Sequence, residues 1–188
     1  MGGLIGISGS LREGSFNTAL LKAAVDLMPP GEPLTIATIR GIPLYDGDVE
    51  AQGLPELVKS LKDAVAASSG LLLVTPEYNN SIPGVFKNAI DWLSRPAADI
   101  PRVFGGKPVA LIGASPGGFG TILSQNAWLP VLRTLGCEMW TQGRLMVSRA
   151  PTVFGADGAL TDPKISEQLR VFLRGFAAFA QSLGAART

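Results

Sequence analysis

Residues 4–17 have the sequence LIGISGSLREGSFN, in which a short apolar run is followed by a loop of glycine and hydroxyl residues. Residues 4–7 are typical of a strand that is buried on both faces of a sheet. After the loop, from Phe16 to Met28, apolar residues recur at the spacing of one helix face. A strand, a loop and a helix in this order form the unit of a parallel sheet, because parallel neighbours need a crossover connection.

The same unit recurs along the chain. Asp162 and Pro163 are expected to open the last helix, which should run to about residue 183. Right-handed crossovers leave few arrangements, and the common one for five strands has the order 2-1-3-4-5. We therefore expect an α/β fold of three layers around a five-stranded parallel sheet, in one domain spanning residues 1–188. The other strands are predicted at residues 34–39, 71–74, 109–112 and 145–147, and the other helices at about 55–67, 83–94 and 120–135.

The composition excludes several kinds of site. The 188 residues include no histidine and a single cysteine, Cys137. Triads that use histidine, histidine-ligated metals, internal disulfides and Cys-x-x-Cys motifs are therefore excluded. Lys plus Arg is 16 and Asp plus Glu is 15, so the net charge of +1 lacks the excess of a broad basic face. We expect no metal site and no nucleic-acid partner.

Segments that would direct the chain to a membrane are not recognisable in the sequence. No apolar run approaches the roughly 20 residues that cross a bilayer, and the first residues do not resemble a signal peptide. We expect a cytoplasmic protein that does not insert into membranes.

Two loops match catalytic motifs only in part. Gly9 and Gly14 have the spacing of a Walker A loop, but Ser15 stands where the phosphate-binding lysine belongs. Residues 113–117 match the G-x-S-x-G pattern of a hydrolase nucleophile, but the chain has no histidine to act as the base. The sequence therefore argues against both a nucleoside triphosphatase and a serine hydrolase.

The loop at residues 8–17 keeps the features of a different phosphate site. Its glycines allow close approach of the backbone, its hydroxyls can donate hydrogen bonds, and the following helix presents its N-terminus. The alternative is an ordinary turn in which Ser15 only caps the helix. Both roles are compatible, so we expect the loop to bind one monophosphate group.

Several motifs together resemble the NADPH-dependent FMN reductase family, and most closely its quinone, azo-dye and chromate reductases. They are GSLREGSFN at residues 9–17, PEYNNS at 76–81, KNAIDW at 87–92 and GAS at 113–115. The resemblance covers roughly residues 4–135. It implies a flavodoxin-like fold, FMN as cofactor, NADPH or NADH as co-substrate, and a homodimer or homotetramer.

By position, the resemblance also assigns the cofactor-binding residues. For two of these residues another role is also open. Tyr78 could be an aromatic residue of the core and not a flavin contact, and Arg12 could be a solvated surface charge and not a phosphate contact. The sequence departs from the family at Leu123 and Leu129, where members often carry an arginine nearby, and Pro130 is expected to kink that helix. Phosphate contacts are implied for Ser10, Arg12, Ser15, Phe16 and Asn17, and contacts to the isoalloxazine for Pro76, Glu77, Tyr78, Asn79, Ser81, Ser115, Gly117 and Gly118.

The reaction expected from this resemblance is a two-electron ping-pong cycle. Hydride passes from NAD(P)H to N5 of the flavin, and then to a quinone or a similar acceptor such as a flavin, an azo compound or chromate. The cofactor carries this chemistry, so no catalytic side chain is needed. The alternatives are a flavodoxin-like electron carrier, whose acidic docking surface the net charge does not support, and a flavin-binding module without turnover.

Self-association is expected through the helices that follow residues 75–82 and Gly120. Their apolar residues exceed what one core face needs, and an interface there would complete the flavin pocket from a second subunit. The residues concerned are Val85, Phe86, Ile90, Trp92, Leu93 and Trp128.

Overall fold

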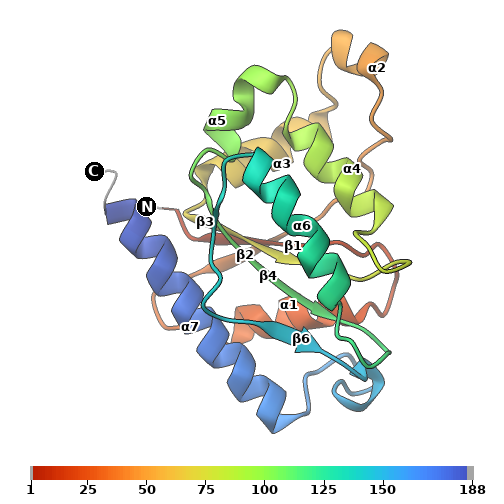
Figure 1. Cartoon of the computed structure of the whole chain (residues 1–188), viewed down its shortest axis with the longest axis vertical. Coiled ribbons are helices and arrows are strands. Elements are labelled where there is room, and N and C mark those ends of the chain that lie inside the picture. Colours follow the sequence, from red (N-terminus) through yellow and green to blue (C-terminus); the bar gives the residue numbers. More distant parts are fainter. Residues whose placement is uncertain (1, 186–188) are drawn as a thin grey trace.

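Strand β1 (Leu4–Ser8) lies inside a parallel sheet whose strands follow the order β2-β1-β3-β4-β5 (Figure 1). The computed structural model describes residues 2–185, so positions 1 and 186–188 of the expected domain lie outside the described residues. The predicted strand order is confirmed. The other strands are β2 (Leu34–Ala37), β3 (Gly70–Val74), β4 (Pro108–Ala114), β5 (Glu138–Met139) and β6 (Leu145–Val147).

The fifth position in the sheet is divided between two short strands. Strand β5 pairs with Pro108 and Val109 of β4, whereas β6 pairs with β4 from Ile112 to Ala114. The sequence analysis predicted β6 and missed β5, because two residues are too few to carry a periodic signal. Residues 140–144 between them belong to no strand, although the backbone N–H of Trp140 still donates to the Val109 carbonyl over 2.9 Å.

Helices cover both faces of the sheet (Figure 1). Helices α1 and α7 pack on one face, and α3, α4 and α6 on the other, because the buried residues of the chain form one apolar cluster on each side. Asp162 opens α7 as predicted, since its Oδ1 accepts hydrogen bonds from the backbone N–H groups of Lys164 and Ile165. The helices are α1 (Phe16–Asp26), α2 (Gly47–Ala51), α3 (Glu56–Ala67), α4 (Gly84–Leu93), α5 (Ile100–Val103), α6 (Ile122–Thr134) and α7 (Pro163–Ala185).

The apolar residues of α4 and α6 that were expected to be surplus are mostly core residues. Phe86 and Trp128 are fully buried and meet edge to face, with ring centroids 5.0 Å apart. Ile90, Trp92 and Leu93 are also buried within the chain. The prediction was wrong for these five residues, because α4 packs between the sheet, α3 and α6 and needs an apolar surface on more than one side.

Helix α6 continues through Pro130 to Thr134. A proline in this position removes the hydrogen bond that the Asn126 carbonyl would otherwise accept. Among residues 2–185, no helix has the length and apolar character needed to cross a membrane.

Candidate functional site

The loop between β1 and α1 forms a cradle of backbone donors. Ser15 caps α1, and its Oγ accepts a hydrogen bond of 3.4 Å from the backbone N–H of Thr18. The backbone N–H groups of residues 13–17 donate to no other group in the described part of the chain. Gly14 has a φ of 64°, which glycine adopts without the cost that a side chain would add. Unpaired N–H groups at a helix N-terminus make a site for an anion.

Side chains of the same loop line an open cavity of about 880 Å³. Ser10 Oγ accepts a hydrogen bond from the backbone N–H of Arg12, and the Arg12 guanidinium lies over the Phe16 ring, 5.7 Å from its centroid. Arg40, beyond the end of β2, donates to the Leu11 carbonyl over 2.6 Å. Arg12, Lys22 and Arg40 line this cavity together with two acidic residues, Glu13 and Asp157.

Asn17 has a different role from the one expected of its side chain. It is buried, its Oδ1 accepts from the backbone N–H of Ala114 over 2.9 Å, and its Nδ2 donates to the Ala114 carbonyl over 2.8 Å. These bonds fix the first turn of α1 against the end of β4. The backbone N–H of Asn17 stays free to bind an anion.

The loop after β3 contains a tight turn. The backbone N–H of Tyr78 donates to the Ser81 carbonyl and the reverse bond also forms, at 3.1 Å and 3.0 Å. Asn79 and Asn80 between them have φ values of 50° and 61°, the left-handed conformation of a type I′ turn. Tyr78 is 48% exposed, so it is not the core aromatic of the alternative interpretation. The backbone N–H groups of Glu77, Asn79 and Asn80 have no acceptor among the residues that the structure describes.

The side chain of Glu77 does not point away into solvent. Its Oε2 accepts hydrogen bonds from the backbone N–H groups of Leu123 and Ser124, in the first turn of α6. No sequence signal predicted this contact, because the partners are 46 and 47 residues apart. The loop after β3 and the start of α6 are thereby joined.

The loop after β4 supplies the third group of predicted residues. The Ser115 and Gly117 carbonyls accept hydrogen bonds from the backbone N–H groups of Ala150 and Arg149. A Cβ added at Gly117 or Gly118 would meet nothing within 4 Å, so this side of the loop is open. The loop therefore presents backbone toward free space, as the approach of a flat ligand would require.

The three loops lie at one edge of the sheet, on the right in Figure 1. Their strands run parallel, with Ser8 opposite Val74 in the β1–β3 register, and the backbone N–H of Thr75 donates to the Ile112 carbonyl. The carboxyl ends of such strands are where open α/β sheets bind ligands. The structure thus brings the predicted site residues to one edge. Sequence reasoning missed the segment after β6, whose Phe154 stacks on Phe16 with centroids 5.8 Å apart.

The loop after β2 is held against α4 near this edge. The Pro43 carbonyl accepts hydrogen bonds from Asn88 Nδ2 and Trp92 Nε1, at 2.8 Å and 2.9 Å. The Tyr45 hydroxyl donates to Glu50, and this hydrogen bond raises the pKa of Tyr45 above its ordinary value. Leu44 stays 81% exposed on the same loop.

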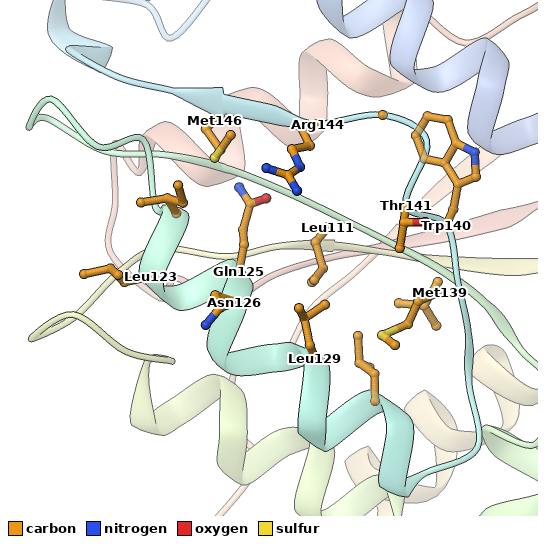
Figure 2. A pocket seen from close by; sticks show the side chains of 14 residues that line it. Leu111, Leu123, Gln125, Asn126, Leu129, Met139, Trp140, Thr141, Arg144 and Met146 are labelled. Atoms are coloured by element: carbon orange, nitrogen blue, oxygen red, sulfur yellow. The ribbon is translucent and has the colours of Figure 1, made fainter.

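A second cavity, of about 350 Å³, lies between α6 and residues 139–146. Figure 2 shows Leu123 and Leu129 of α6 on one side of it and Trp140 and Met146 on the other, with Arg144 above Gln125. Its floor includes Leu111 of β4, at the point where the fifth strand is interrupted. It is a mainly apolar hollow with one charged group at its rim.

Comparisons with known proteins agree on one family. The model of the NADPH-dependent FMN reductases matches residues 3–152. The chain is 43% identical over 180 residues to an NAD(P)H-dependent FMN reductase of Pseudomonas aeruginosa, covering 96% of each chain. It is 37% identical over 175 residues to a 2-hydroxy-1,4-benzoquinone reductase of a Burkholderia species, covering 93% of this chain and 94% of the relative. The flavoenzyme NAD(P)H:(acceptor) oxidoreductase FerB of Paracoccus denitrificans superposes with a TM-score of 0.87 at 34% identity, over 97% and 98% of the two chains.

Proposed function

This chain belongs to the NADPH-dependent FMN reductase family, and from that membership we propose that the three loops at the carboxyl edge of its sheet form the FMN site. The protein is an oxidoreductase that depends on FMN and NAD(P)H. When bound, FMN would supply the redox chemistry that carries a hydride from NAD(P)H to an acceptor. The residues of the chain bind and orient the reactants.

The observation that carries this proposal is the set of free backbone N–H groups at residues 13–17. A phosphate monoester fits such a donor set, because it carries a double negative charge and several strong acceptor oxygens. The hydroxyls of Ser10 and Ser15 and the guanidinium of Arg12 add donors around the same cradle. Phe16 and Asn17 contribute backbone N–H groups. No lysine or metal ion is needed to hold one monophosphate in this way.

For the flavin ring we propose the loops after β3 and β4 as its two walls. Pro76, Tyr78 and Ser81 shape the first wall, while the free N–H groups of Glu77 and Asn79 can donate to oxygen and nitrogen atoms at the ring edge. Oriented backbone donors of this kind stabilise negative charge without reorganising during the reaction. The second wall consists of Ser115, Gly117 and Gly118, with open space beside the glycines.

We propose a quinone as the electron acceptor. The support comes from relatives named quinone reductases, one of which, from Pseudomonas putida, is 35% identical over 175 residues. The exposed face of Tyr78 provides an aromatic surface on which a flat acceptor can stack. No side chain has to transfer a proton for the hydride steps themselves.

The test compares FMN with riboflavin. Titration of the purified protein should show much weaker binding of riboflavin, because it lacks the phosphate. Adding NADPH to the FMN complex without oxygen should bleach the flavin, and a benzoquinone should restore its absorbance. Equal affinity for the two flavins would reject residues 9–17 as the phosphate site, and a flavin that neither NADPH nor NADH can bleach would reject the enzyme.

We further propose that copies of the chain associate through α6 and residues 139–146, as a homodimer or a homotetramer. Ile122, Leu123 and Leu129 are each about 40% exposed around the apolar cavity of Figure 2. A surface of this kind is costly to leave in water.

The proposal of one domain is supported by the single sheet, and the cytoplasmic location stays a prediction.

A further inference from the structure

Helix α6 is capped by a residue from another part of the chain. Its own N-cap residue, Thr121, has a φ of 69° and makes no capping hydrogen bond with its side chain in the described structure. The Thr121 hydroxyl is buried and accepts from Gln125 Nε2 instead. Glu77 takes over the cap, since its Oε2 lies 2.8 Å from the backbone nitrogen of Leu123 and 3.1 Å from that of Ser124. A carboxylate in this place also meets the positive end of the helix dipole.

A second connection joins the same two elements beneath the cap. Thr75 Oγ1 and Ser124 Oγ are 2.8 Å apart, and Trp128 Nε1 donates to Thr75 Oγ1 over 3.1 Å. All three side chains are fully buried. The start of the loop after β3 is therefore fixed to α6, and the Glu77 carboxylate extends that attachment toward the open edge.

The position of Glu77 links the two walls of the proposed flavin site. Its backbone N–H is one of the free donors of the loop after β3. Its carboxylate holds the helix that begins directly after residues 115–121. A loop whose end is tied to a rigid helix loses less freedom when a ligand binds, and this raises affinity.

We propose that Glu77 is a positioning residue, whose carboxylate holds the loops after β3 and β4 in their binding arrangement before FMN is bound. This inference rests on the proposed FMN site and adds a specific role for one side chain. In this proposal the two parts of Glu77 have different roles. Its backbone N–H faces the cofactor, and its carboxylate binds the first turn of α6.

The test measures FMN affinity and amide hydrogen exchange in the cofactor-free protein. Glu77→Ala should raise the exchange rates of Leu123 and Ser124 and weaken FMN binding about tenfold, as expected if the competent arrangement falls to about a tenth of the population. Glu77→Gln keeps an oxygen that can accept both hydrogen bonds, so it should restore most of the affinity and protection. Glu77→Asp is too short to reach both N–H groups and should resemble Glu77→Ala.

Asp162→Ala is the matched control, because Asp162 caps α7 through two N–H groups at 2.8 Å and 2.9 Å, away from the loops after β3 and β4. It should lower thermal stability and leave FMN affinity unchanged. If Glu77→Ala binds FMN as tightly as the wild type, or if Glu77→Gln is as impaired as Glu77→Ala, the inference is overturned. Should Glu77→Ala fail to fold, the comparison of Glu77→Asp with Glu77→Gln decides. A wild-type protein that does not bind FMN would instead reject the proposed function.

Discussion

At the scale of single residues, the structure separates what a motif contributes through its backbone from what it contributes through its side chains. Asn17 stands in the predicted phosphate motif, yet its amide group is used by Ala114, 97 residues away. Ser15 caps α1 as predicted and remains next to the free N–H groups. The motif thus predicted the location of the cradle and not the partner of each polar atom.

Ser15→Ala tests the cradle at one residue. The change removes a hydroxyl that can donate to a phosphate oxygen, a charge-assisted bond worth about 1.5–3 kcal/mol. FMN should therefore bind about 10- to 100-fold more weakly in a fluorescence titration, and riboflavin affinity should not change. A loss of the same size for both flavins would mean that the substitution acts through α1 as a whole.

Cys137 should be unreactive in the folded protein. Burial raises the pKa of its thiol to about 12, so the thiolate that alkylating reagents require is scarce at pH 8. Mass spectrometry after treatment with iodoacetamide should find the native protein unmodified and the urea-unfolded protein fully alkylated. Rapid alkylation of the native protein would contradict the raised pKa of this partly buried thiol.

At the scale of elements, contacts between segments hold the edges of the fold. The 3₁₀ turn Ala97–Asp99 and α5 are held by Lys62 of α3, whose side chain is 1% exposed and whose Nζ lies 2.7 Å from Asp99 Oδ2. Lys62 also donates to the Arg95 carbonyl. From its residue type alone, Lys62 would be expected at the surface. Its burial is possible because Arg95 and Asp99, more than 30 residues later in the chain, bind its ammonium group.

Asp99→Asn should reveal the contribution of the Lys62–Asp99 ion pair through the pH dependence of the Tm difference from the wild type. Hydrogen bonds from Lys62 and Arg102 lower the pKa of Asp99 below its ordinary value of 3.8. A carboxyl with a lowered folded pKa stabilises the protein above its unfolded pKa and stops doing so as the pH falls through the folded one. The variant should therefore have a lower Tm than the wild type at pH 7, and the difference should narrow below about pH 4.

Asp63→Asn is the control for Asp99→Asn. Asp63 also pairs with Arg102, at 2.9 Å, but its side chain is 70% exposed, so the pair should contribute little. Calorimetric scans from pH 3 to pH 7 provide the comparison. A Tm difference for Asp99→Asn that is constant over this range would show that the charge of Asp99 is not involved.

The loop after β3 should favour two-electron reduction. Flavodoxin-type carriers stabilise the one-electron-reduced flavin by turning a peptide toward it, which a flexible, usually glycine-containing loop permits. Here residues 75–83 contain no glycine, Pro76 and Pro83 restrict the ends, and the Tyr78–Ser81 bonds lock the turn. Anaerobic titration with dithionite should pass from oxidised to fully reduced flavin with little radical absorbance. Strong radical absorbance at the midpoint would favour the electron-carrier alternative.

At the scale of the whole molecule, the sheet brings distant loops to one edge and leaves an exposed, mainly apolar cavity beside α6. The fifth position of the sheet is interrupted between β5 and β6, and the cavity of Figure 2 opens there against α6. Leu123 and Leu129 of α6 line this cavity. The association proposed at this face would therefore rest on apolar contact.

Light scattering at micromolar concentration tests this surface. The wild type should have two or four times the mass of one chain of 19.6 kDa. Leu129→Glu places a charge at the rim of the cavity and should shift the protein toward the monomer. Val171→Glu, at a residue of α7 that is 52% exposed, is the control and should not change the mass. A wild type that is monomeric and fully active would contradict the proposed interface.

Sequence patterns predicted the strand order, the donor-rich loop at residues 9–17, the caps at Ser15 and Asp162, and the family. These features depend on local periodicity, on turn and cap chemistry, and on motifs of fixed spacing, all of which lie within a few residues of one another. Three features became visible only in the folded chain: Glu77 caps α6, Asn17 binds Ala114, and Phe86 and Trp128 belong to the core. Each depends on which side chains meet after the chain has folded, and a hydrogen bond between residues 46 to 97 positions apart leaves no periodic signal in the sequence.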